Sequence, residues 1–87
     1  MNSVQHMKDL ALSDTGFVFD PYSGATFTVN PAGLCILHGL REGLSRGELR
    51  ERMRQRFELQ GEELDRDISD FLGLLRQHEL IPNDFNF

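Results

Sequence analysis

Residues 17–29, FVFDPYSGATFTV, decide the fold of this chain. Apolar and polar side chains alternate on both sides of a central Asp-Pro-Tyr-Ser-Gly segment, whose proline and glycine suit a turn. Such a period of two predicts a β-hairpin with one buried face, because successive side chains of a strand point to opposite sides. We therefore expect Phe17 and Phe19 to share one face of the first strand, and Phe27 and Val29 to share one face of the second.

The hydrophobic spacing changes from the strand period to the helical period after Asn30. Asn30 is a good N-cap, and a proline fits the first helical position that follows it. We predict an α+β fold, a three-stranded antiparallel N-terminal sheet followed by three helices, which is winged helix-turn-helix-like. The expected strands cover residues 10–12, 17–20 and 25–29. The first expected helix begins at Pro31 and ends at Gly43. The second begins at the Ser45–Glu48 capping box and ends at Gln60-Gly61, and the third extends from about Glu62 to His78.

The chain has 87 residues, which predicts a single domain over 1–87, with an ordered core at about 9–81 and a flexible tail at 82–87. No apolar run approaches the roughly 20 residues of a membrane span. The N-terminus lacks the apolar region of a secretory signal. A single cysteine, Cys35, cannot form an internal disulfide. These features predict a cytoplasmic protein that makes no membrane contact.

No motif in the sequence indicates catalysis, a metal or a cofactor. Cys35 and His38 are spaced as two ligands on one helix, but a structural zinc site needs four. Asp65, Asp67 and Asp70 suggest acid–base chemistry, yet a solvated helix face is the simpler interpretation. We therefore expect a protein that is not an enzyme and that holds neither a metal nor a cofactor.

The charge of the chain is unevenly distributed. The net charge is −5, but residues 41–56 carry six arginines against three glutamates. This basic helix suggests a winged-helix DNA-binding module as the alternative function. An acidic chain is a poor nucleic-acid binder, however, and Asp67 and Asp70 occupy the third helix, where a DNA reader needs basic residues. A charged solvent face is the simpler interpretation, and we expect no nucleic-acid partner.

The third strand offers the best candidate for a binding surface. If residues 25–29 form a sheet edge, their free N–H and C=O groups can pair with an added strand. Helical geometry places Asp67, Asp70 and Leu74 beside the buried stripe of the third helix, where they would form one wall of a shallow groove. Peptide binding by strand addition follows as a hypothesis. The same edge leaves the oligomeric state open between a monomer and an edge-mediated dimer.

The order and spacing of several motifs over residues 9–81 resemble the PqqD-like proteins, small peptide chaperones that are also called RiPP recognition elements. More narrowly, the chain resembles the subgroup found with HPr-kinase-related proteins. The motifs are FVFDPYSGATFTVN at 17–30, Gly33, Ile36-Leu37, Leu40, Gly43, DISDFL at 67–72 and Leu80.

This resemblance implies three strands followed by three helices, and no catalytic residues. It also implies a function, which is to bind the leader of a ribosomally made precursor peptide and present it to a modifying enzyme. The leader adds as a strand to the third strand and lies against the third helix. Carried onto this chain, the peptide-binding residues are Ala25, Thr26, Phe27, Thr28 and Val29 for backbone pairing, and Asp67, Asp70, Phe71 and Leu74 for side-chain contacts. The acids beside the groove favour a neutral or basic leader.

Overall fold

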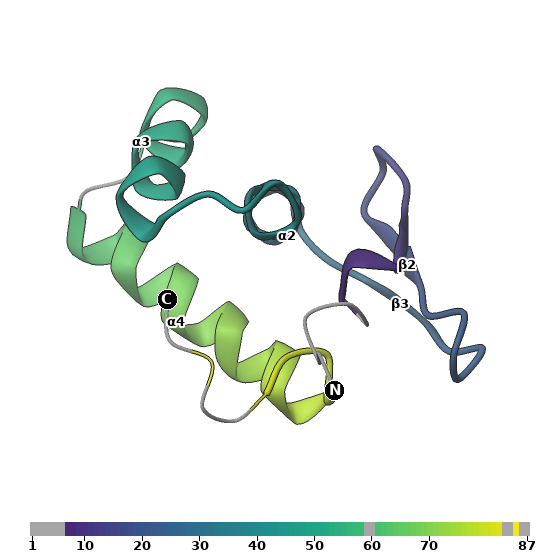
Figure 1. The fold of residues 1–87 in the computed structure, drawn as a ribbon. Helices are drawn as coiled ribbons and strands as arrows, with labels where there is room; N and C mark the ends of the chain where they lie inside the picture. The colour runs from purple at the N-terminus through teal and green to yellow at the C-terminus, as the bar shows by residue number, and fades with distance from the viewer. Residues whose placement is uncertain (1–6, 59–60, 83–84, 86–87) are drawn as a thin grey trace.

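A computed structural model describes residues 7–58, 61–82 and 85 of the chain. It has a three-stranded antiparallel sheet of order β1-β2-β3, followed by three helices, so the predicted fold class is confirmed (Figure 1). The likeness to a winged helix-turn-helix stays a prediction. The elements are β1 (Ala11–Leu12), β2 (Phe17–Phe19), β3 (Thr26–Thr28), α2 (Pro31–Glu42), α3 (Arg46–Arg56) and α4 (Gly61–Gln77).

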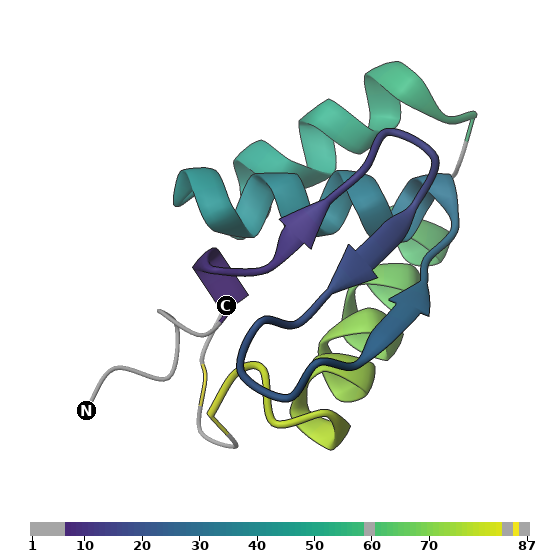
Figure 2. The same ribbon diagram turned by 90° about the vertical axis from the view of Figure 1, so that its right-hand side faces the viewer.

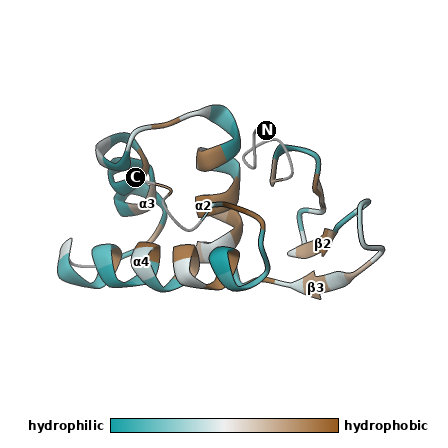
Figure 3. Ribbon diagram, turned by 60° about the horizontal axis from the view of Figure 1, so that its bottom comes forward, coloured by the Kyte–Doolittle hydropathy of each residue, from teal (hydrophilic) through white to brown (hydrophobic). Residues whose placement is uncertain are grey.

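Helix α2 occupies the centre of the structure. Figure 1 shows it end-on, with the sheet on one side and α3 and α4 on the other. In Figure 3, hydrophobic residues follow much of α2, whereas they alternate with hydrophilic residues along α4. Each helix buries apolar residues at helical spacing, and Leu80 and Ile81 pack back on the core. The buried hydrophobic residues are Met7, Leu10, Val18, Cys35, Ile36, Leu37, Leu40, Leu49, Met53, Leu64, Ile68, Phe71, Leu72, Leu75, Leu80 and Ile81.

The helix ends follow the predicted capping residues. Asn30 Oδ1 accepts a hydrogen bond of 2.8 Å from Gly33 N–H, and Gly43 ends α2 in the left-handed conformation with φ of 81°. The capping box of Ser45 and Glu48 is present at the start of α3. Helix α3 ends at Arg56, before the predicted break, because Phe57 takes an extended conformation.

The hairpin register puts a different face of β2 in the core from the predicted one. Val18 pairs with Phe27 and is fully buried, whereas Phe17 and Phe19 are 59% and 42% exposed. The prediction that these two phenylalanines lie on the buried face is wrong. The bond from Asp20 N–H to the Ala25 carbonyl leaves a four-residue loop, so Phe17 and Phe19 lie opposite Thr28 and Thr26 rather than opposite Phe27.

Asp20 holds this loop together from within. Its side chain is only 6% exposed, and its two carboxylate oxygens accept hydrogen bonds from Tyr22 N–H and Ser23 Oγ. The Tyr22 hydroxyl donates in turn to the Asp9 carboxylate, and this bond raises the pKa of Tyr22. The loop is therefore fixed both internally and to the segment that precedes β1.

The C-terminal segment returns to the core through Phe85. Its side chain is partly buried against the core, and its carbonyl accepts a bond of 3.1 Å from Arg76 Nη2. Phe87 lies outside the described residues. The division of the chain into an ordered core and a flexible tail stays a prediction.

The turn before β2 requires a glycine at position 16. Gly16 has φ of +94°, and its carbonyl accepts a bond of 2.9 Å from Val29 N–H. A Cβ atom at this position would lie 2.4 Å from the Val29 carbonyl oxygen, closer than van der Waals contact allows. Gly24 also has a positive φ, of +78°, but a Cβ atom there would meet nothing within 4 Å. A side chain at position 24 would therefore cause backbone strain alone, whereas one at position 16 would cause both backbone strain and a steric clash.

We expect Gly24→Ala to lower the free energy of unfolding by about 1–2 kcal/mol, the cost of a left-handed conformation for a residue with a Cβ atom. Gly16→Ala should lower it further, because the added methyl also displaces the Val29 backbone from its bond to the Gly16 carbonyl. Urea unfolding of both variants measures the two losses. Equal losses would contradict the close approach of Gly16 to Val29.

Candidate functional site

In the described part of the chain, the outer edge of β3 carries unpaired backbone groups. β3 is the last strand of the sheet there and pairs only with β2. Hydrogen bonds at both ends of this pairing, from Asp20 N–H to Ala25 and from Val29 N–H to Gly16, show that odd-numbered residues of the strand face β2. The backbone N–H and C=O groups of alternate residues in an antiparallel strand point to opposite edges of the strand. The N–H and C=O groups of Thr26 and Thr28 therefore point away from the sheet, at the edge that Figure 2 shows in front of α4.

The four α4 residues predicted for the site line a single cavity. Asp67, Asp70, Phe71 and Leu74 recur at spacings of three and four, which places them on one side of the helix. The cavity has a volume of about 380 Å³. Its other wall is the beginning of α2, with Asn30, Ala32, Gly33 and Ile36.

A second cavity, of about 280 Å³, lies between the hairpin and the residues that follow α4. Ala25, Thr26 and Phe27 line it, opposite His78 and Glu79. The rings of Phe27 and His78 stack with centroids 5.2 Å apart and planes 3° apart, so β3 contacts the end of α4 directly. Three of the five predicted β3 residues are thus brought to the C-terminal end of α4.

His78 lines the cavity beside β3 but is not among the peptide-binding residues predicted from the sequence. The sequence predicts it only as the end of the third helix. The sequence spacing indicates its position, since His78 lies four residues after Leu74 and therefore continues the same face of the helix.

Thr28 and Val29 lie apart from these two cavities. The Thr28 side chain is exposed on the outer face of the sheet, so only its backbone belongs to the edge. Val29 lines a third cavity, of about 320 Å³, that also contains Cys35 and His38. In the described part of the chain, no group of three or more histidine, cysteine, aspartate or glutamate side chains could hold a metal ion.

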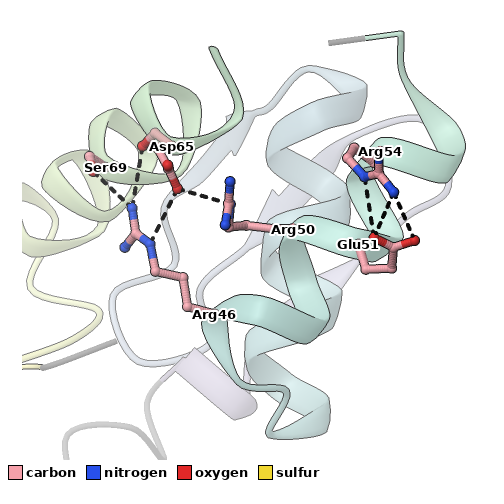
Figure 4. Close-up of polar contacts among 6 residues, drawn as sticks. All are labelled: Arg46, Arg50, Glu51, Arg54, Asp65 and Ser69. Atoms are coloured by element: carbon pink, nitrogen blue, oxygen red, sulfur yellow. Dashed lines mark hydrogen bonds and ion pairs between the residues drawn. The ribbon is translucent and has the colours of Figure 1, made fainter. Parts of the chain in front are cut away.

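Most arginines of α3 form ion pairs with neighbouring helices. Asp65 of α4 lies 3.6 Å from Arg46 Nε and 3.1 Å from Arg50 Nε (Figure 4). Arg46 Nη2 also donates a bond of 3.2 Å to Ser69 Oγ. These contacts join α3 to α4. Figure 4 shows that the pair of Arg54 and Glu51 lies apart from them, within α3.

Arg52 joins α3 to α2. Its two terminal nitrogens donate bonds of 2.7 Å and 2.9 Å to the two carboxylate oxygens of Glu42. The spacing of four residues would also allow Arg52 to pair with Glu48. Glu48 instead accepts from Ser45 N–H at 2.8 Å and completes the helix cap. The arginine cluster thus acts mainly within the fold, and this gives the DNA-binding alternative no support.

The Arg52 guanidinium, through its hydrogen bonds, lowers the pKa of Glu42. A carboxyl whose pKa is lowered by folding stabilises the folded state above the pH where a free glutamate titrates, and this stabilisation disappears as the pH falls through the folded pKa. We therefore expect Glu42→Gln to lose less stability than the wild type between about pH 5 and pH 3. Urea unfolding at several pH values measures the difference. Glu58→Gln, which removes an exposed carboxylate that forms no ion pair within the described residues, is the control and should follow the wild type.

The family model described as coenzyme PQQ synthesis protein D (PqqD) matches residues 15–81 of the chain. This range contains β2, β3, all three helices and every residue of the two cavities beside α4. No curated protein matches the chain, and no solved structure matches it. Within the described residues, no helix combines the length and apolar character needed to cross a membrane.

Proposed function

The chain belongs to the PqqD family, and we propose that it is a non-catalytic peptide chaperone. It binds the leader of a ribosomally synthesised precursor peptide by strand addition and presents that peptide to a modifying enzyme. The observation that supports this proposal is the edge of β3 that faces away from β2, where Thr26 and Thr28 direct their backbone groups outward and Thr26 lines the cavity of about 280 Å³. Membership of the subgroup found with HPr-kinase-related proteins stays a prediction.

Backbone pairing supplies affinity that does not depend on the guest sequence. The outward groups of Thr26 and Thr28 provide two donors and two acceptors. Each hydrogen bond contributes about 0.5–1.5 kcal/mol net, and ordering the guest strand offsets part of the sum. Edge pairing alone therefore gives weak binding, and side-chain contacts must supply the specificity.

The side chains of a guest strand alternate between the outer face of the sheet and the side of α4. A guest residue opposite Phe27 forms a non-hydrogen-bonded pair, in which the two Cα atoms lie about 4.5 Å apart and the side chains touch. It would pack on the stacked rings of Phe27 and His78. Guest residues two positions away on either side would approach the two cavities.

We place this activity in the cytoplasm, where ribosomally made precursors are available. The buried thiol of Cys35 is free, and a reducing compartment keeps it so. A monomer would present its peptide through the β3 edge, whereas an edge-mediated dimer would use the same backbone groups and compete with the peptide.

Amide hydrogen exchange tests the strand addition directly. Synthetic peptides that cover the N-terminal halves of short reading frames beside the gene serve as probes. We expect a bound peptide to slow exchange at the amides of Thr26 and Thr28, because these N–H groups become hydrogen-bonded. The Phe27 amide faces β2 and should change little, so it is an internal control. Peptide binding that leaves the exchange of Thr26 and Thr28 unaltered would argue against pairing at this edge.

A proline at position 28 removes one outward donor. Proline is tolerated in edge strands, so Thr28→Pro should fold. We expect it to weaken binding of the same peptides about tenfold, which corresponds to about 1.4 kcal/mol, through one lost hydrogen bond and a steric clash. Thr28→Val keeps the N–H group and should bind like the wild type. Fluorescence anisotropy measures the peptide affinity of both variants. Unchanged affinity in a folded Thr28→Pro variant would contradict binding by strand addition.

A further inference from the structure

We infer that the guest strand carries a cationic side chain, lysine or arginine, which enters the cavity of about 380 Å³ between α4 and the beginning of α2. The inference rests on the proposed function and adds the chemistry of the guest to it. Asp67 and Asp70 supply the charge of this cavity, and Ile36, Phe71 and Leu74 supply its apolar wall.

The charges of Asp67 and Asp70 are not balanced within the described part of the chain. Neither carboxylate lies within ion-pair distance of a cation there, although Arg66 is placed four residues before Asp70 on the same helix. Asp65, on a different side of α4, is paired with two arginines. The two cavity acids lie three residues apart and repel each other. A cation between them removes this repulsion.

The beginning of α2 is the other charged feature of the cavity. The N-terminal end of a helix is equivalent to about half a positive charge. Asn30 already satisfies Gly33 N–H there, and Pro31 has no N–H to offer. Half a charge does not balance two carboxylates, so the cavity keeps a negative potential. An acidic guest residue would be repelled from it, whereas a basic one would be attracted.

The spacing of α4 side chains matches that of an added strand. Residues on one face of a strand lie about 6.6–6.8 Å apart. Helix α4 rises about 1.5 Å per residue, so Asp70, Leu74 and His78 follow one another at about 6 Å along the axis. A guest strand can therefore place successive inward side chains against the Phe27–His78 stack, Leu74 and the acids.

This geometry specifies a pattern for the guest. A cationic residue lies two positions from an inward apolar residue, which packs against Leu74 and Phe71. The aliphatic stem of a lysine or arginine can also cover this apolar wall while its charged end reaches Asp67 and Asp70. The structure thus assigns to the guest an amphipathic strand with one cation beside Asp67 and Asp70.

Selection from a random library of twelve-residue peptides tests this pattern without knowledge of the natural precursor. The library is selected against the wild type, against the double variant Asp67→Asn with Asp70→Asn, and against the control Glu58→Gln with Glu62→Gln. Both double variants remove two negative charges, but Glu58 and Glu62 are exposed and line neither cavity beside α4. The net charge of the protein therefore changes equally in the two cases.

We expect the wild type and the control to enrich lysine or arginine about threefold or more at one position, two residues from an enriched apolar position. The cavity variant should lose this enrichment. A lysine-containing peptide selected on the wild type should bind the cavity variant about tenfold more weakly in low salt, and high salt should reduce the difference.

Two outcomes separate this inference from the proposed function. Selected peptides that slow amide exchange at Thr26 and Thr28 without a preferred cation, or with the same preference in the cavity variant, would overturn the inference and leave the proposed function standing. Selected peptides that leave both amides unprotected would overturn the strand addition, and the inference with it. Amide exchange of each free variant also confirms that it is folded.

Discussion

The pairing register of β2 and β3 is the constraint on which the rest of the structure depends. The bonds from Asp20 to Ala25 and from Val29 to Gly16 determine it at its two ends. One register assigns Val18 and Phe27 to the core, Phe17 and Phe19 to the surface, and the backbone of Thr26 and Thr28 to the free edge. Because strand side chains and backbone groups alternate together, a slip of one residue would reverse all three assignments.

Close packing of the helices places a groove beside the paired strands β2 and β3. A Cβ atom on Gly33 would lie 2.8 Å from Phe71 Cε1, so this glycine allows α2 to approach α4 closely. The approach leaves Asp67, Asp70 and Leu74 on the wall of a cavity, and the stack of Phe27 and His78 joins the other end of α4 to β3. Helix α4 is therefore packed against α2 at Phe71 and against β3 at its C-terminal end.

Among the described residues, some charged side chains form ion pairs between the helices, whereas the two acids of the cavity do not. Arg46, Arg50 and Arg52 join α3 to its neighbours through Asp65 and Glu42. Such partly exposed pairs contribute little stability each. The acids of the cavity form no such pair within the described residues. Most of the arginines that stand out in the sequence are thus paired within the described part of the fold, whereas Asp67 and Asp70 are not.

The order of the elements, the caps at Asn30 and Ser45 and the apolar stripes of the helices could be predicted from the sequence, because these depend on contacts within a few residues. The sequence also pointed to β3 and to the face of α4 that contains Asp70 and Leu74. It could not show which face of β2 is buried, since the loop length and the buried Asp20 set the register. It could not show the stack of Phe27 with His78 or the pair of Arg52 with Glu42 either, because residues distant in sequence meet only when the elements pack together.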